Sequence, residues 1–197
     1  ATDSVIPLRV VHEAQKRWED VPPEAPAPLV LGVDVARFGD DETVIQPVRG
    51  GYAWLPTTLS KADGPTVAEE VVRMALAMRS GERERVRINV DGIGVGSSVV
   101  DALRRHEACA EGDVFVVDVN VGESADDEDH SNLRSQLWFG LRTWLIEGGA
   151  IQDDDSLESE LLAPTYTFDA RGRKKVMSKE DIRKVIGRSP DRADELC

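Results

Sequence analysis

Two short apolar stretches of the chain each end on an aspartate that interrupts a hydrophobic pattern. Residues 29–36 read LVLGVDVA, with Asp34 set among valines and leucines, and residues 86–91 read VRINVD, which ends at Asp91. Both stretches are typical of buried β-strands, where an ionised carboxylate costs several kcal/mol unless a cation compensates it. Two such strands suggest a metal site.

A cluster of carboxylates at strand ends favours one kind of chemistry. Like charges about 4 Å apart repel by about 4 kcal/mol at an effective dielectric constant of roughly 20, so the cluster is stable only when it is protonated or binds cations. Oxygen ligands favour Mg²⁺ or Mn²⁺, and two such ions hydrolyse phosphodiesters by activating a water and stabilising the leaving oxygen. Asp191 and Asp194, near the end of the chain, could complete the cluster.

The elements around these aspartates predict an α/β domain with a mixed sheet. After residues 29–36, the stretches 43–48 and 52–59 read as strands joined through a glycine turn, which gives an antiparallel meander. Helices and strands then alternate, which predicts parallel strands with helices on both faces of the sheet. The expected elements are helices over 67–79, 95–105, 131–147 and 157–162, strands over 86–91 and 114–119, a hairpin of 166–169 with 174–178, a helical turn at 181–186 and a final helix from 189.

A short helix and a proline-rich linker precede this sheet. Apolar residues recur at helical spacing over residues 6–18, and residues 21–28 contain four prolines that cannot continue a helix. At 197 residues with 41% hydrophobic residues, the chain can bury one substantial core. We therefore expect residues 1–28 to form the helix and linker, and residues 29–197 to form the compact domain.

The charge of the chain argues against a nucleic-acid partner only at first sight. The net charge is −13, but exposed charges are screened beyond about 8 Å, so a local basic surface can still bind a polyanion. Such a surface is offered by the hairpin tip and the segment after it, and the alternative is a solvated hairpin. The candidate DNA contacts are Arg171, Arg173, Lys174, Lys175 and Lys179.

The apolar, cysteine and histidine residues exclude several further classes of protein. No apolar run approaches the ~20 residues that would span a bilayer. Cys109 and Cys197 are too few for a disulfide scaffold and wrongly spaced for a zinc site. The histidines His12, His106 and His130 lack the spacing of a metal site and are expected at the surface, while Trp138 and Trp144 are expected in the core.

Five motifs in order resemble the nuclease domain of the large terminase subunit of tailed bacteriophages. They are GVDVA at 32–36, the positions Gly39, Asp41 and Thr43, VDGIGVG at 90–96, Ser178-Lys179, and SPDRAD at 189–194. The resemblance covers the chain from about residue 29 to its end. It implies an RNase H-like fold and a two-metal endonuclease that cuts concatemeric double-stranded viral DNA.

The resemblance also implies roles for particular residues. Asp34 and Asp91 fall on the first and second metal ligands of the family, and Asp194 on the third. Asp191, one helical turn earlier, could serve instead or assist. Asp41 matches an acidic position where a supporting role is expected rather than direct ligation. Because the final helix stops just past Asp194, three residues from the end of the sequence, we expect this ligand to be loosely held.

The cofactors, partners and location that the resemblance implies follow from the packaging of viral DNA. They are two Mg²⁺ or Mn²⁺ ions, double-stranded DNA, a portal protein, a small terminase subunit and the cytoplasm of the host cell, with no membrane contact. An ATPase domain is a further expected partner, because these residues contain no Walker A motif. The chain is therefore expected to be the nuclease domain alone.

Two other function classes stay open on the sequence. The turn from Asp34 to Thr43 also suits the phosphate-gripping turn of an actin-like or sugar-kinase-like ATPase, although such a protein would not need the basic hairpin. The chain could also be a noncatalytic docking module of a packaging motor, for which its negative charge would suit a basic protein partner.

Overall fold

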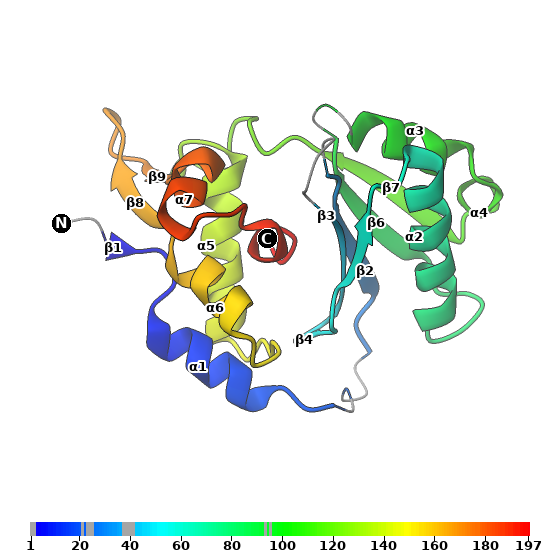
Figure 1. Ribbon diagram of the computed structural model, residues 1–197, viewed down its shortest axis with the longest axis horizontal. Helices are drawn as coiled ribbons and strands as arrows, with labels where there is room; N and C mark the ends of the chain where they lie inside the picture. The colour runs from blue at the N-terminus through cyan, green and yellow to red at the C-terminus, as the bar shows by residue number, and fades with distance from the viewer. Residues whose placement is uncertain (1–2, 21, 23–25, 37–41, 93, 95) are drawn as a thin grey trace. The chain divides into compact units, whose positions relative to one another are not determined.

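The computed structural model in Figure 1 describes residues 3–20, 22, 26–36, 42–92, 94 and 96–197. The chain packs into two compact units. Residues 23–120 form the first, the sheet unit, and residues 1–22 with 121–197 form the second, the helical unit. The boundary at residue 28 that the composition suggests stays a prediction.

A mixed β-sheet organises the sheet unit, in the order β4-β3-β2-β6-β7 with β5 also paired to β3. Strand β3 is antiparallel to β2, β4 and β5, whereas β6 is parallel to both β2 and β7. The expected meander followed by parallel strands is therefore confirmed. The strands are β2 (Leu29–Asp34), β3 (Glu42–Arg49), β4 (Tyr52–Ala53), β5 (Thr57–Ser60), β6 (Val86–Asp91) and β7 (Val114–Val119).

The strand expected over 52–59 was wrong in one respect, because it is two strands. Pro56 lies between β4 and β5 and cannot donate a ladder hydrogen bond. Trp54 keeps the segment attached to β3 by donating its backbone N–H to the Pro47 carbonyl, with an N···O distance of 3.1 Å. Both short strands therefore continue along the same edge of β3.

Helices α2 (Gly64–Met78) and α3 (Gly96–Arg105) cover one face of this sheet (Figure 1). Asp63 caps α2 by accepting the backbone N–H of Thr66 at 2.9 Å. A further short helix, α4 (Glu107–Ala110), was not expected. Its cap is His106, whose Nδ1 accepts the backbone N–H of Ala108, so this histidine has a structural role. The core of the unit includes Leu31, Val33, Ile88, Val90, Val71 and Leu103, all fully buried.

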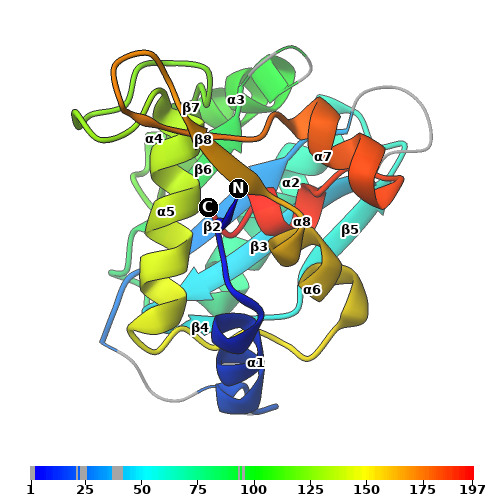
Figure 2. The same ribbon diagram turned by 90° about the vertical axis from the view of Figure 1, so that its left-hand side faces the viewer.

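The helical unit joins both ends of the described chain. Helix α1 packs against α5 and α6, and α6 packs against α8 (Figure 2). A small antiparallel sheet in the order β1-β8-β9 completes the unit, and its strand β1 was not expected. The elements are β1 (Asp3–Ser4), α1 (Leu8–Arg17), α5 (Leu133–Ile146), α6 (Asp155–Leu162), β8 (Thr165–Phe168), β9 (Lys174–Val176), α7 (Lys179–Ile186) and α8 (Asp191–Asp194).

The helical unit buries aromatic side chains from α5 and from the segment before it. Trp138 is 1% exposed, so its expected place in the core is confirmed, whereas Trp144 is only half-buried. The expectation for His130 was wrong, because this histidine is only 9% exposed. Its Nδ1 lies 2.8 Å from Oδ2 of Asp127, and this pairing offsets the cost of burying the ring.

Within the part of the chain that the structure describes, no helix is both long enough and apolar enough to cross a membrane.

Candidate metal centre

Asp34 and Asp91 lie at the carboxyl ends of two neighbouring parallel strands, β2 and β6. The register pairs Val33 with Val90, so each aspartate stands one residue beyond that pair. Both valines are fully buried in the core. Because side chains alternate between the two faces of a sheet, both aspartates point to the opposite face, where both are half-buried. The structure thus brings these two predicted ligands to one edge and one face of the sheet.

Close packing follows Asp91 at two glycines. A side chain at Gly96 would meet backbone, so that position requires glycine, whereas one at Gly92 would meet the exposed side chain of Asp118, which can rotate away. A Cβ atom at Gly96 would lie 1.8 Å from the backbone carbonyl oxygen of Asp91. A Cβ atom at Gly92 would lie 1.7 Å from Oδ1 of Asp118. The absence of a side chain at Gly96 lets the backbone fold against the end of β6 and fixes where Asp91 leaves the sheet.

Asp118 is a third carboxylate near these strand ends, and the motifs did not predict it. It lies on β7 in register with Val90, so its exposed side chain leaves the sheet on the face opposite to Asp34 and Asp91. The sequence did carry a signal, because residues 114–119 read VFVVDV, a third apolar strand with an aspartate near its end. Its contact with Gly92 gives it a place beside the turn that follows Asp91.

The segment after β2 contains the predicted supporting residue Asp41, which lies outside the described residues. Thr43, on the far side of that segment, is 1% exposed. Its Oγ1 accepts the backbone N–H of Ala36 at 3.1 Å. This hydrogen bond joins the two chain segments on either side of residues 37–41, close to the end of β2.

Asp194 lies on α8 in the helical unit, where side chains of α5 hold it. Its Oδ1 accepts the Nε1–H of Trp138 at 3.2 Å and lies 2.8 Å from Nη1 of Arg134. The side chains of Arg134 and Asp194 are only 13% and 12% exposed. The Arg134 guanidinium carbon also lies 5.8 Å from the centroid of the Trp138 ring. A largely buried ion pair therefore fixes the orientation of the third predicted ligand.

Lys179 contacts both of the alternative third ligands. Its Nζ lies 2.9 Å from Oδ1 of Asp191 and 3.5 Å from Oδ2 of Asp194. Ser189 also donates its hydroxyl to Asp191. The structure therefore brings Asp191 and Asp194 together around one ammonium group, and Lys179 would have to exchange these partners to contact DNA.

Helix α8 is well anchored, so the expectation of a loosely held third ligand was wrong. Oε2 of the buried Glu160 accepts the backbone N–H groups of Arg192 and Ala193, both at 3.1 Å. Burial raises the pKa of Glu160, while the Ala193 N–H and the Arg188 guanidinium act in the opposite direction. Arg192 also pairs with Asp154 at 2.8 Å. These contacts come from α6 and its cap, about thirty residues earlier in the chain.

The basic hairpin contains two kinds of cation. Arg171 and Lys175 are exposed. Arg173 is engaged within the hairpin, where Nη2 lies 2.8 Å from Oδ2 of Asp169. Nζ of Lys174 lies 4.9 Å from the centroid of the Phe139 ring. Of these four predicted DNA contacts, Arg171 and Lys175 are therefore the ones most open to solvent.

The support for a metal centre comes from the type of ligand atom, the carboxylate oxygens of Asp34 and Asp91, and not from a group of three or more ligands already in place among the described residues. Asp34 and Asp91 supply oxygen donors of the type that Mg²⁺ and Mn²⁺ prefer, at adjacent strand ends. Among the described residues, no group of three or more His, Cys, Asp or Glu side chains is arranged to hold a metal ion. The residues present fit the predicted ions in kind, and a cluster that includes Asp194 or Asp191 stays a prediction.

Known structures share this fold over almost the whole chain, although the sequence matches no protein-family profile and no curated protein. A mutant nuclease domain of the large terminase subunit gp2 of bacterial virus Sf6, with manganese, matches with a TM-score of 0.72 at 18% identity, covering 98% of this chain and 97% of that one. The large terminase nuclease from thermophilic phage G20c with bound cobalt matches with a TM-score of 0.59 at 17% identity, covering 100% and 95%.

The large terminase nuclease domain of Thermus phage P74-26 also matches, with a TM-score of 0.57 at 16% identity over 98% of this chain and 92% of that one. These identities are low, so the likeness concerns the fold. The expected RNase H-like architecture is confirmed, and the chain has the fold of the nuclease domains of phage large terminase subunits.

Proposed function

We propose that this protein is a metal-dependent endonuclease of the terminase type, which cuts double-stranded DNA by two-metal hydrolysis of the phosphodiester backbone. One observation carries the proposal: Asp34 and Asp91 stand side by side at the ends of parallel strands. They do so on a fold shared with terminase nucleases that were crystallised with manganese, magnesium or cobalt. Carboxylates in this arrangement suit divalent cations and phosphoryl chemistry.

The proposed roles divide among the aspartates. Asp34 and Asp91 hold Mg²⁺ or Mn²⁺, and Asp194 supplies the third ligand, with Asp191 as the alternative. The bound ions would supply the activation of water and the stabilisation of the leaving oxygen. The chain itself orients the ligands: the sheet register aligns Asp34 with Asp91, and Arg134 with Trp138 fixes Asp194.

The remaining roles concern DNA and assembly. Arg171 and Lys175 contact phosphates, with Arg173, Lys174 and Lys179 nearby as further cations, and Asp41 supports the ligands without binding the metal. We place the nuclease domain at residues 29–197. The expected setting is viral DNA packaging in the host cell, with an ATPase domain, a portal protein and a small terminase subunit as partners.

Cleavage of supercoiled plasmid tests this function. With Mg²⁺ or Mn²⁺ the protein should produce nicked and linear DNA, and a chelator should stop the reaction. Asp34→Asn and Asp91→Asn should each lower the rate by about a hundredfold or more, because each removes a charged metal ligand. Asp101→Asn is the matched control, since Asp101 is an exposed aspartate of α3.

Two results would contradict the proposal. Full cleavage by Asp34→Asn would remove this residue from the metal site. The absence of metal-dependent cleavage in the unaltered protein would instead favour the docking module, which binds a partner and cuts nothing.

A further inference from the structure

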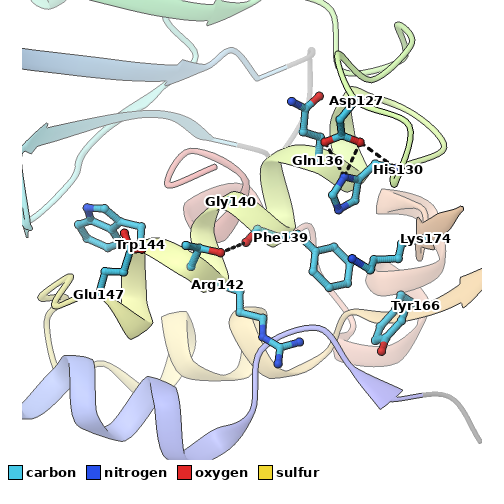
Figure 3. Close-up of a pocket in the computed structure, with 11 residues that line it drawn as sticks. Asp127, His130, Gln136, Phe139, Gly140, Arg142, Trp144, Glu147, Tyr166 and Lys174 are labelled. Atoms are coloured by element: carbon cyan, nitrogen blue, oxygen red, sulfur yellow. Dashed lines mark hydrogen bonds and ion pairs between the residues drawn. The ribbon is translucent and has the colours of Figure 1, made fainter.

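A surface pocket of about 680 Å³ lies in the helical unit between α5, the β8–β9 hairpin and the loop before α5 (Figure 3). Its volume falls in the range of about 300 to 1,000 Å³ that is typical of small-molecule sites. Its lining includes Asp127, His130, Phe139, Gly140, Tyr166 and Lys174. No role proposed above uses the pocket as a binding site.

Aromatic rings form a continuous row along this pocket. The ring centroids of His130 and Phe139 are 5.2 Å apart, those of Phe139 and Tyr166 are 5.1 Å apart, and those of Tyr166 and Phe168 are 5.8 Å apart. Phe168 continues the row beyond the residues that line the pocket and is 63% exposed. A solvent-facing aromatic ring on a strand is the kind of surface on which nucleobases stack.

Cations stand next to the aromatic row. Lys174 lines the pocket, and its Nζ lies over the Phe139 ring at 4.9 Å from the centroid (Figure 3). Arg171 at the hairpin tip is exposed, and so is Lys175, which leaves β9 on the face opposite to Lys174 and Phe168. Aromatic rings interleaved with Lys and Arg suit a ligand that combines planar bases with phosphates.

Two acidic residues line the pocket, the exposed Glu147 and Asp127, and Asp127 is largely engaged by its own surroundings. Oδ1 of Asp127 accepts the backbone N–H groups of Asp129 and His130, both at 2.9 Å, and Oδ2 lies 2.8 Å from Nδ1 of His130. These contacts lower the pKa of Asp127, with the His130 side-chain hydrogen bond as the largest cause. Its charge is therefore partly compensated and opposes an anionic ligand less than a solvated carboxylate would.

Two further details indicate space and unmet hydrogen bonding in the pocket. A Cβ atom at Gly140 would meet no described atom within 4 Å, although glycine inside a helix costs about 1 kcal/mol relative to alanine. Nε2 of the buried His130 has no hydrogen-bond partner among the residues that the structure describes. An open floor and an unsatisfied ring nitrogen are features that a bound polar group would use.

We propose that this pocket binds unpaired nucleotides of a DNA strand. Bases stack on Phe168 and Tyr166, while Lys174 contacts a phosphate. An unpaired strand fits better than a duplex, because the faces of paired bases are covered by their neighbours in the stack. The inference extends the DNA substrate of the proposed function, but it concerns binding and requires no metal.

Fluorescence anisotropy with a labelled oligothymidine, in the presence of a chelator, tests the site. The protein should bind this strand more tightly than a duplex of the same length. Phe168→Ala should weaken single-strand binding by about tenfold, the size of effect expected for one lost stacking platform. The matched control is Phe115→Ala, which removes another exposed phenylalanine of a strand that has a cation, Arg85, over its ring at 5.6 Å.

A second variant fills the pocket without removing an aromatic ring. Gly140→Leu places a side chain on the open floor and favours the helix, so the thermal stability should hold or rise while single-strand binding falls. Equal affinity for duplex and single strand, or equal losses in Phe168→Ala and Phe115→Ala, would overturn the proposal. Mononucleotide binding as tight as that of the oligonucleotide would overturn the assignment to a strand.

The binding and cleavage assays distinguish a failure of the pocket proposal from a failure of the nuclease proposal. If the pocket binds no single strand, Mn²⁺-dependent plasmid cleavage is still expected. If the nuclease proposal fails, Asp34→Asn and the unaltered protein should still bind the oligothymidine equally in the chelator.

Discussion

The two units position their aspartates by different physical means. In the sheet unit, the backbone sets Asp34 and Asp91, because the parallel register of β2 and β6 aligns them and glycine at position 96 lets the turn close. In the helical unit, side chains set Asp194, through its ion pair with Arg134 and its hydrogen bond from Trp138. One half of the proposed centre is therefore fixed by topology, and the other by charges.

This difference predicts different sensitivities. A side-chain position set by the backbone changes only when the backbone itself is forced to move. We expect such a movement to cause a large loss of cleavage, because the packed interior resists it. A position set by an ion pair can be altered by one side-chain substitution, with a cost that depends on the burial of the pair.

Gly96→Ala should have the largest effect, because it attacks the position that the backbone sets. The new Cβ would overlap the Asp91 carbonyl at 1.8 Å, so the end of β6 must move. We expect plasmid cleavage to fall by about a hundredfold, as for a ligand displaced by an ångström. Gly81→Ala is the control, since its Cβ would meet no described atom within 4 Å. Equal cleavage by the two variants would show that the turn does not set Asp91.

Arg134→Met tests the position that charges set. It leaves Asp194 largely buried without its guanidinium partner, which should cost about 3 kcal/mol in the free energy of unfolding, measured with urea. Cleavage should fall by about tenfold at a temperature where the variant is folded. Arg9→Met is the control, because the Arg9 and Glu13 side chains are 81% and 49% exposed and their pair should contribute little. A stability loss no greater than that of the control would contradict this account.

Acid should weaken the sheet unit through Glu84, which joins β2 to the turn before β6. Arg49 binds both carboxylate oxygens of Glu84, at 2.6 and 2.9 Å, and Leu29 donates its backbone N–H. The Arg49 hydrogen bonds are the main cause that lowers the pKa of Glu84 from 4.5 to about 2. A lowered pKa gives stability that is present above pH 4.5 and is lost as the pH falls towards 2.

We expect this loss to be on the order of 2 kcal/mol after allowance for solvent screening. Urea unfolding at a series of pH values measures it. Glu84→Gln should be less stable at neutral pH and should lose less stability on acidification than the unaltered protein. Parallel pH profiles for the two proteins would remove Glu84 from the acid response.

The exposed cations of the hairpin should have the smallest effect, because they lie on the surface and act through phosphates alone. The double variant Arg171→Ala with Lys175→Ala should weaken duplex binding several-fold and reduce the salt slope by about two, close to 0.9 for each lost phosphate contact. Metal binding should be unchanged, which calorimetry with Mn²⁺ can check. An unchanged salt slope would place the hairpin outside the duplex path.

The pattern of the sequence was enough to predict the elements and contacts that arise from neighbouring residues. Apolar runs rich in valine, leucine and isoleucine predicted β2 and β6. The aspartates at the ends of those strands were predicted to stand together, because parallel strands end at one edge. Asp118 could have been found in the same way, since its strand also carries an aspartate near its end.

Contacts between distant segments were not predictable from such patterns. Glu160 holds the backbone of α8 from an earlier helix, and nothing in the spacing of residues 155–162 indicates this. The edge strand β1 is only two residues long and forms because β8 offers it a partner. The burial of His130 likewise depends on Phe139 and Asp127, which the fold brings to it.

A crystal of the full chain soaked in Mn²⁺ tests the central claim most directly. The account predicts anomalous signal at the carboxylates of Asp34 and Asp91, shared with Asp194 or Asp191, and loss of that signal in Asp34→Asn. Manganese bound only at other carboxylates, or no signal beside Asp34 and Asp91 at saturating Mn²⁺, would contradict it.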